Sequence, residues 1–163
     1  MSSNDLINEL YAIFAQKQRQ LYVAALAITR ERSSAEDSVH DALVAMASLS
    51  EKPENLEAYL FRTVRNKALH VIKQRNRVDS NTDQDEFLDV EECSASQKIF
   101  VSQIAERMNK LDENSRQVLI MKLFADLTFK EIASIMQSPP NTIASWYRRG
   151  IEKLKEEVYE QHI

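Results

Sequence analysis

The sequence predicts an all-α protein composed of two small helical domains joined by an acidic linker. The chain of 163 residues contains one glycine and three prolines, although average usage is about 7% glycine and about 5% proline. Sheets need frequent tight turns with residues at positive φ, so this scarcity argues against Rossmann, P-loop, barrel and sandwich folds. Two further observations support the prediction: apolar residues recur at the helical period, and charge changes sign sharply along the chain.

The charge change divides the chain. Residues 56–77 contain six basic residues and one acid, whereas residues 79–92 contain seven acids and no base. The acidic stretch is rich in Ser, Asn and Thr and has no helical apolar period, as is typical of a linker. We therefore expect helical domains at 1–78 and 97–163 with a linker at 79–96. Each domain is small, so each has limited burial of its own.

Three helices are expected in the first domain. The first apolar pattern predicts one long helix, or two helices joined near residues 16–20. Ser34, with Asp37 three residues later, resembles a capping box that opens a second helix through about Leu49. Pro53 suits the first turn of a third helix over about 54–77. The apolar positions of the first pattern are Leu6, Ile7, Leu10, Phe14, Leu21, Ala25 and Ile28.

The second domain has clearer helix boundaries. Asp112 is a good N-cap for an apolar helix that continues to about Phe124. Thr128 and Glu131 have the spacing of a full capping box, which opens a short helix ending near Met136. Residues 138–141, Ser-Pro-Pro-Asn, break that helix, and a last helix covers about 142–160.

The short helix, the break and the last helix together have the form of a helix-turn-helix motif, which places its second helix in the DNA major groove. A helical wheel puts Ile143, Tyr147 and Gly150 on an inward stripe. Arg149 lies on the opposite face, and because arginine reads guanine through two hydrogen bonds we expect Arg149 to contact a base. The candidate DNA-binding residues of this helix are Asn141, Thr142, Ser145, Trp146, Arg148, Arg149 and Lys153.

The third helix of the first domain has a basic face that also carries an aromatic ring and an amide. Cations neutralise phosphates, and rings stack on unpaired bases, so this face suits DNA. The alternative is an ordinary solvated helix face. The candidate residues are Tyr59, Arg62, Arg65, Asn66, His70 and Lys73.

Other chemistry is not indicated. A lone cysteine, Cys93, excludes an internal disulfide, the three histidines are scattered, and we expect no metal site and no cofactor. The sequence shows no nucleophile elbow, phosphate loop or carboxylate cluster, so we do not expect an enzyme. No apolar run approaches the roughly 18 residues of a membrane span, and the chain is expected to be cytoplasmic.

Four segments occur in an order that resembles the extracytoplasmic-function group of bacterial sigma factors. They are Ser34–Leu43 (SAEDSVHDAL), Ala58–Ala68 (AYLFRTVRNKA), Leu111–Leu119 (LDENSRQVL) and Leu127–Ala133 (LTFKEIA). The resemblance covers about 6–77 as region 2 and about 97–158 as region 4. Three departures stand out: Gln137 replaces the usual turn glycine, Trp146 replaces a frequent basic residue, and His40 replaces a usual glutamine.

The resemblance implies a non-enzymatic protein that binds core RNA polymerase and directs it to promoter DNA. Region 2 would bind the clamp of the largest subunit through Asp37, His40 and Asp41, and would meet the −10 element with the loop 48–55 and the third helix. Region 4 would sit on the flap of the other large subunit and read the −35 element. The acidic linker would pass through a basic channel of the polymerase, although a solvated tether is an equal alternative. Family members are often held inactive by anti-sigma factors.

Two other functions remain open from the sequence. One is a helix-turn-helix transcriptional regulator with an N-terminal helical partner-binding domain, which would bind duplex DNA without polymerase. The other is a helical scaffold that binds no nucleic acid.

Overall fold

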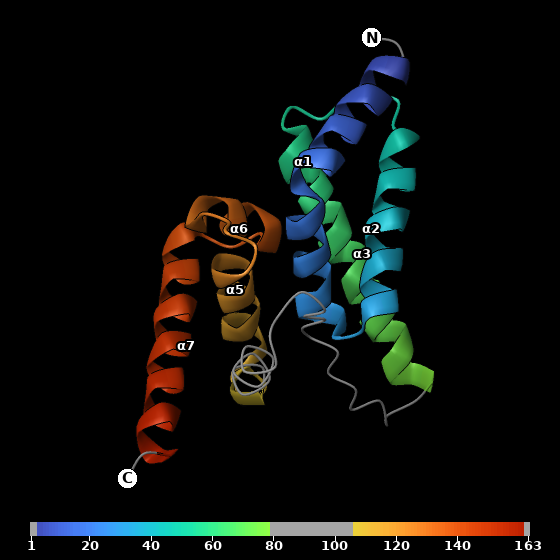
Figure 1. Ribbon diagram of the computed structural model, residues 1–163. Coiled ribbons are helices and arrows are strands. Elements are labelled where there is room, and N and C mark those ends of the chain that lie inside the picture. The colour runs from blue at the N-terminus through green and yellow to red at the C-terminus, as the bar shows by residue number, and fades with distance from the viewer. Residues whose placement is uncertain (1–2, 79–105, 162–163) are drawn as a thin grey trace.

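The computed structural model describes residues 3–78 and 106–161, and within these ranges it is helical with no strand. The first group of helices is α1 (Ser3–Thr29), α2 (Arg32–Ala47) and α3 (Leu56–Val78), which pack against one another as a bundle. The second group is α5 (Glu113–Leu123), α6 (Phe129–Met136) and α7 (Pro140–Gln161). This confirms the predicted all-α class, and Figure 1 shows α5 between α7 and the α1–α3 bundle. The predicted linker, 79–96, lies outside the described residues.

Helix boundaries in the first bundle follow local chemistry, with two corrections. Lys17 has non-helical dihedral angles, φ −116° and ψ 16°, so α1 is kinked at this residue. The kink agrees with the second expectation from the sequence, two helices joined near residues 16–20. The predicted capping box at Ser34 is wrong, because α2 already begins at Arg32 and its N-cap, Glu31, makes no side-chain cap bond. Pro53 precedes α3 rather than opening it. The α3 start is capped by Asn55, whose Oδ1 accepts from the Ala58 amide at 3.1 Å.

The second group matches its predicted boundaries closely. Asp112 caps α5 by accepting a hydrogen bond from the Ser115 amide at 3.1 Å. The full capping box of α6 is present: Thr128 Oγ1 accepts from the Glu131 amide at 3.1 Å, and Glu131 Oε1 accepts from the Thr128 amide at 3.0 Å. α7 begins at Pro140, where proline fits because the first helical amide has no partner within the helix.

The two groups share one hydrophobic core. Buried side chains from both form a connected cluster, with α1 packed on α5 and α3 packed on α6. The last turns of α1 are buried on every side, from Ala24 through Thr29, and so is most of α5, from Ser115 through Met121. An amphipathic helix in a small bundle exposes one face. All-round burial therefore shows that α1 and α5 are covered both by their own group and by the other one.

Candidate nucleic-acid and polymerase interfaces

The helix-turn-helix is formed by α6, a tight turn and α7. Gln137, at the end of α6, has φ 54° and ψ 45°, in the left-handed region that usually favours glycine. The Ser138 amide then donates to the Ala133 carbonyl at 3.1 Å and closes the turn. The sequence departure at Gln137 is therefore accommodated without glycine, and the chain is redirected into α7 within three residues.

One face of α7 is fixed against α5 and α6. Ile143 is fully buried, and Gly150 lies against Leu119 of α5. Tyr147 packs edge-on against Phe129 of α6, with ring centroids 5.3 Å apart and an interplanar angle of 65°. This confirms the predicted inward stripe, including the inward position of Gly150, and it leaves the opposite face of α7 outward.

The predicted recognition residues divide into two classes by exposure. Thr142 and Trp146 are half-buried, and Trp146 packs against the hydrophobic core, so its indole covers neighbouring side chains. The remaining five are exposed along the outward face and its flanks. They are Asn141, Ser145, Arg148, Arg149 and Lys153. No ion pair joins Arg148, Arg149 or Lys153 to another residue of the described ranges, so their charges face solvent.

Fewer of the predicted DNA-binding residues of α3 are exposed than the sequence indicated. Tyr59, Asn66, His70 and Lys73 are exposed as predicted, on the side opposite the buried Val64. Arg62 and Arg65 are half-buried on one flank, and the Nε atom of each is buried without a hydrogen-bond partner among the described residues. Burial lowers the pKa of the Arg65 guanidinium, because desolvation disfavours its charged form.

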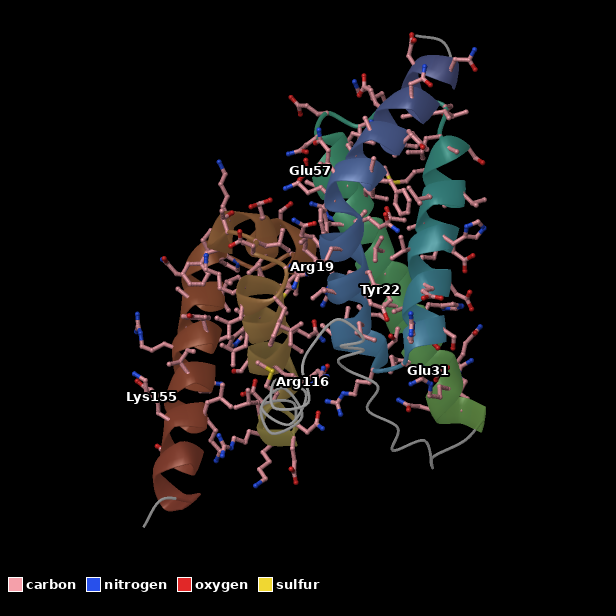
Figure 2. All side chains as sticks on the ribbon, in the orientation of Figure 1. Arg19, Tyr22, Glu31, Glu57, Arg116 and Lys155 are labelled. Atoms are coloured by element: carbon pink, nitrogen blue, oxygen red, sulfur yellow. The ribbon has the colours of Figure 1, made fainter. Side chains whose placement is uncertain are left out.

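Arg75 belongs to the basic cluster in sequence but has a structural position. Its Nη1 donates to the Thr29 carbonyl at 2.9 Å, and its Nη2 donates to Ser34 Oγ at 3.0 Å and lies 3.2 Å from a Glu31 carboxylate oxygen. Arg75 thereby ties α3 to the end of α1 and the start of α2. Figure 2 labels Glu31 at this junction.

The acidic surface of α2 is exposed. Asp37, His40 and Asp41 all face solvent. Val44 shares their helix face and is 55% exposed, which is high for a large apolar side chain. Sequence reasoning missed Val44, although the spacing 37, 40, 41, 44 marks one helix face. A surface with acidic groups beside an exposed apolar residue is suited to bind another protein.

Residues 3–78 and 106–161 contain no group of three or more His, Cys, Asp or Glu side chains placed to hold a metal ion. None of their helices is long and apolar enough to cross a membrane.

Comparison with known proteins matches both groups of helices. The model of sigma-70 region 2 matches residues 13–78, and that of sigma-70 region 4 matches residues 102–154. Among solved structures, CnrH in complex with the cytosolic domain of CnrY matches with a TM-score of 0.69 at 17% identity, over 97% of this chain and 95% of that chain. RpoE of Bartonella quintana, in complex with the anti-sigma factor NepR, matches with a TM-score of 0.63 at 22% identity, over 95% and 97%.

The structural matches show that the arrangement of helices is shared, and the two family models together cover most of the chain in the order region 2, region 4. The order of the two regions, together with a helix-turn-helix whose α7 faces solvent, explains why four segments of the sequence resemble the extracytoplasmic-function group. The chain belongs to the sigma-70 family and is an RNA polymerase sigma factor of the extracytoplasmic-function type.

Proposed function

We propose that α7 reads the −35 promoter element, that α3 and the loop before it meet the −10 element, and that α2 binds the polymerase clamp. The observation that carries this assignment is the orientation of α7. Its Ile143 and Gly150 side is packed on α5 and α6, while the opposite side, with Ser145 and Arg149, faces outward. A helix held this way can enter the major groove with its early residues toward base edges.

Roles within α7 follow from position and chemistry. Arg149 reads a guanine, because a guanidinium can donate to both O6 and N7. Arg148 and Lys153, on the flanks, bind phosphates and set the register of the helix on DNA. Trp146 contributes mainly to packing, since it is half-buried against the core.

The exposed face of α3 serves a different form of DNA. Tyr59 supplies a ring that stacks on an unpaired base, while His70 and Lys73 follow the backbone. The half-buried Arg62 and Arg65 support this face from its flank. Unpaired bases occur where the promoter melts, which supports the assignment of α3 to the −10 element.

Polymerase binding involves both regions and the segment between them. The exposed Asp37, His40 and Asp41 suit a basic or polar clamp surface, and Val44 adds apolar contact. Region 4 would sit on the flap, and the acidic linker 79–96 would follow a basic channel of the enzyme. This sigma factor acts by binding rather than by catalysis and works in the cytoplasm, with no bound cofactor.

The deciding experiment is transcription with purified core polymerase on a library of promoter sequences. We expect transcripts only when this protein is added, and a selected sequence near −35 and near −10. A protein that fails to co-purify with core polymerase, yet protects duplex DNA alone at nanomolar concentration, would instead be an ordinary helix-turn-helix regulator.

A second partner is supported by the two structural neighbours, which are complexes of CnrH with the cytosolic domain of CnrY and of RpoE with the anti-sigma factor NepR. We propose that an anti-sigma factor also binds the present chain and sequesters it. The test is to isolate the bound protein from the host and add it to the transcription assay, where dose-dependent inhibition is expected.

A further inference from the structure

The loop between α2 and α3, residues 48–55, is anchored at both of its ends. At its start Leu49 packs against the hydrophobic core, and directly after its end Leu56 is buried. Between these anchors, every residue of 50–54 except Pro53 is exposed. The middle of the loop therefore needs a contact of its own if it is to hold one conformation.

Lys52 supplies that contact. Its Nζ lies 2.6 Å from Oε1 and 2.5 Å from Oε2 of Glu9 in α1, so both carboxylate oxygens share the ammonium group. In Figure 1 the loop passes beside the N-terminal part of α1, which places Glu9, 43 positions away in the sequence, next to the middle of the loop. Within residues 3–78 and 106–161 this is the one ion pair that the loop makes.

The pair acts on the loop more than on the stability of the fold. Both side chains are partly exposed, and exposed ion pairs contribute little to the free energy of unfolding. A loop that is free before binding must lose conformational entropy when it binds, whereas a loop already held in place does not. A held loop also presents one arrangement of side chains to its ligand, while mobile binding surfaces adapt to several ligands. Holding the loop therefore favours discrimination between sequences.

We infer that Lys52 and Glu9 are positioning residues for the −10 element: their ion pair holds residues 50–54, just before Tyr59, in the arrangement that meets the promoter. The inference rests on the proposed role of α3 and the loop before it. A lysine in a loop that meets DNA would ordinarily be assigned to the phosphate backbone. Here its ammonium group is directed to a carboxylate of α1 instead.

Promoter selection with the holoenzyme tests this role. Lys52→Ala should lower discrimination at the −10 element by about twofold to fivefold, the effect expected from losing one exposed ion pair. Discrimination at the −35 element should not change. Glu9→Lys together with Lys52→Glu reverses the pair and should restore −10 discrimination.

The reversed pair separates positioning from phosphate binding. A lysine that bound phosphate could not be replaced by glutamate, so the double variant would then bind all promoters more weakly, and the salt dependence would fall by about one unit of slope. That result would overturn the inference. Rescue by the reversed pair, with an unchanged salt dependence, supports it.

The order of the loop is measured in the isolated full-length protein without DNA. A nitroxide label at Ser50→Cys, in a Cys93→Ser background, should give a slow-motion spectrum in the parent protein. Lys52→Ala should make the label more mobile, and the reversed pair should restore the slow spectrum. Urea unfolding should be nearly the same for all three proteins, which distinguishes loop positioning from a general loss of stability.

Lys17→Ala is the matched control. It removes an equal charge from α1 by breaking the 3.8 Å pair of Lys17 with Glu57, which lies outside the loop. We expect it to change neither the mobility of the label nor the −10 profile.

Two results would overturn the positioning role: a label equally mobile before and after Lys52→Ala, or a −10 profile that Lys52→Ala leaves unchanged. If the parent holoenzyme selects a −10 sequence in either case, the proposed function stands and only the inference fails. A parent holoenzyme that selects no −10 sequence rejects the proposed role of the loop, and the inference with it.

Discussion

Gly150 of α7 lies so close to Leu119 of α5 that an added Cβ would stand 2.7 Å from the Leu119 Cδ1 atom and 3.1 Å from Cγ. Leu119 is fully buried, so its side chain cannot move aside freely. The one glycine of the chain therefore sets the distance between α5 and α7, and with it the position of α7.

Gly150→Ala is expected to lower the free energy of unfolding by about 1 kcal/mol. Alanine gains about 1 kcal/mol in helix propensity over glycine, but overpacking a filled core costs about 1–3 kcal/mol. Thermal or urea unfolding of the full-length protein measures the difference, and Glu152→Ala, at an exposed position of the same helix, should stay within about 0.5 kcal/mol of the parent. A more stable Gly150→Ala protein would contradict the packing role.

Thr128→Ala should destabilise region 4 by about 1 kcal/mol, because it removes the side-chain cap of α6 and leaves the Glu131 amide without its partner. Thr63→Ala serves as the control, since the Thr63 hydroxyl donates to the Tyr59 carbonyl within the same helix and caps nothing. Equal effects of the two changes on urea unfolding would show that the capping box contributes no particular stability.

Helix existence and the inward stripes could be predicted from the sequence because both depend on local spacing. The capping box at 128–131 is local, and it is present. The one at Ser34 fails for a non-local reason: α2 begins two residues earlier, and the Ser34 hydroxyl is used by Arg75 from α3. α3 contains six basic residues, and the sequence alone does not distinguish the structural Arg75 from the exposed Lys73. The arrangement of the neighbouring helices determines that difference.

The sequence itself indicates that the end of α1 packs against another part of the chain. Residues 23–28, Val-Ala-Ala-Leu-Ala-Ile, contain no polar position, and a helix that is apolar all round must be covered all round. The partner could not be named from the sequence, since α5 is more than 80 residues away. Arg116, a buried cation of α5, also reports this packing, because its Nη1 donates to the Ala27 carbonyl of α1.

Arg149→Ala should relax promoter selectivity at one position of the −35 element by about 1–3 kcal/mol, because a bidentate contact to guanine is lost. Selection of promoter variants with the holoenzyme measures this. Lys153→Ala is the comparison: a lost phosphate contact weakens all sequences equally and lowers the salt dependence by about one unit of slope. A selection profile for Arg149→Ala identical to that of the parent would remove Arg149 from base readout.

Asp37→Arg should reduce retention on immobilised core polymerase by about tenfold, because it places a cation on the α2 surface proposed for the clamp. Asp5→Arg changes the net charge equally at an exposed position of α1, and it should bind normally. Val44→Ser should weaken retention less than Asp37→Arg, since it removes apolar contact without repulsion. Unaltered retention of the Asp37 variant would exclude that residue from the interface.

Arg75→Ala should destabilise region 2 by about 2 kcal/mol, because hydrogen bonds from a charged group to partly buried partners are worth more than neutral ones. The loss leaves the Thr29 carbonyl at the end of α1 without its arginine donor, so the α1–α2 junction is where the effect should appear, as faster amide exchange. Arg77→Ala removes an equal charge from an exposed position two residues along and should change stability by no more than about 0.5 kcal/mol. If instead Arg75→Ala left unfolding unchanged and weakened only promoter binding, Arg75 would belong to the DNA surface with Lys73.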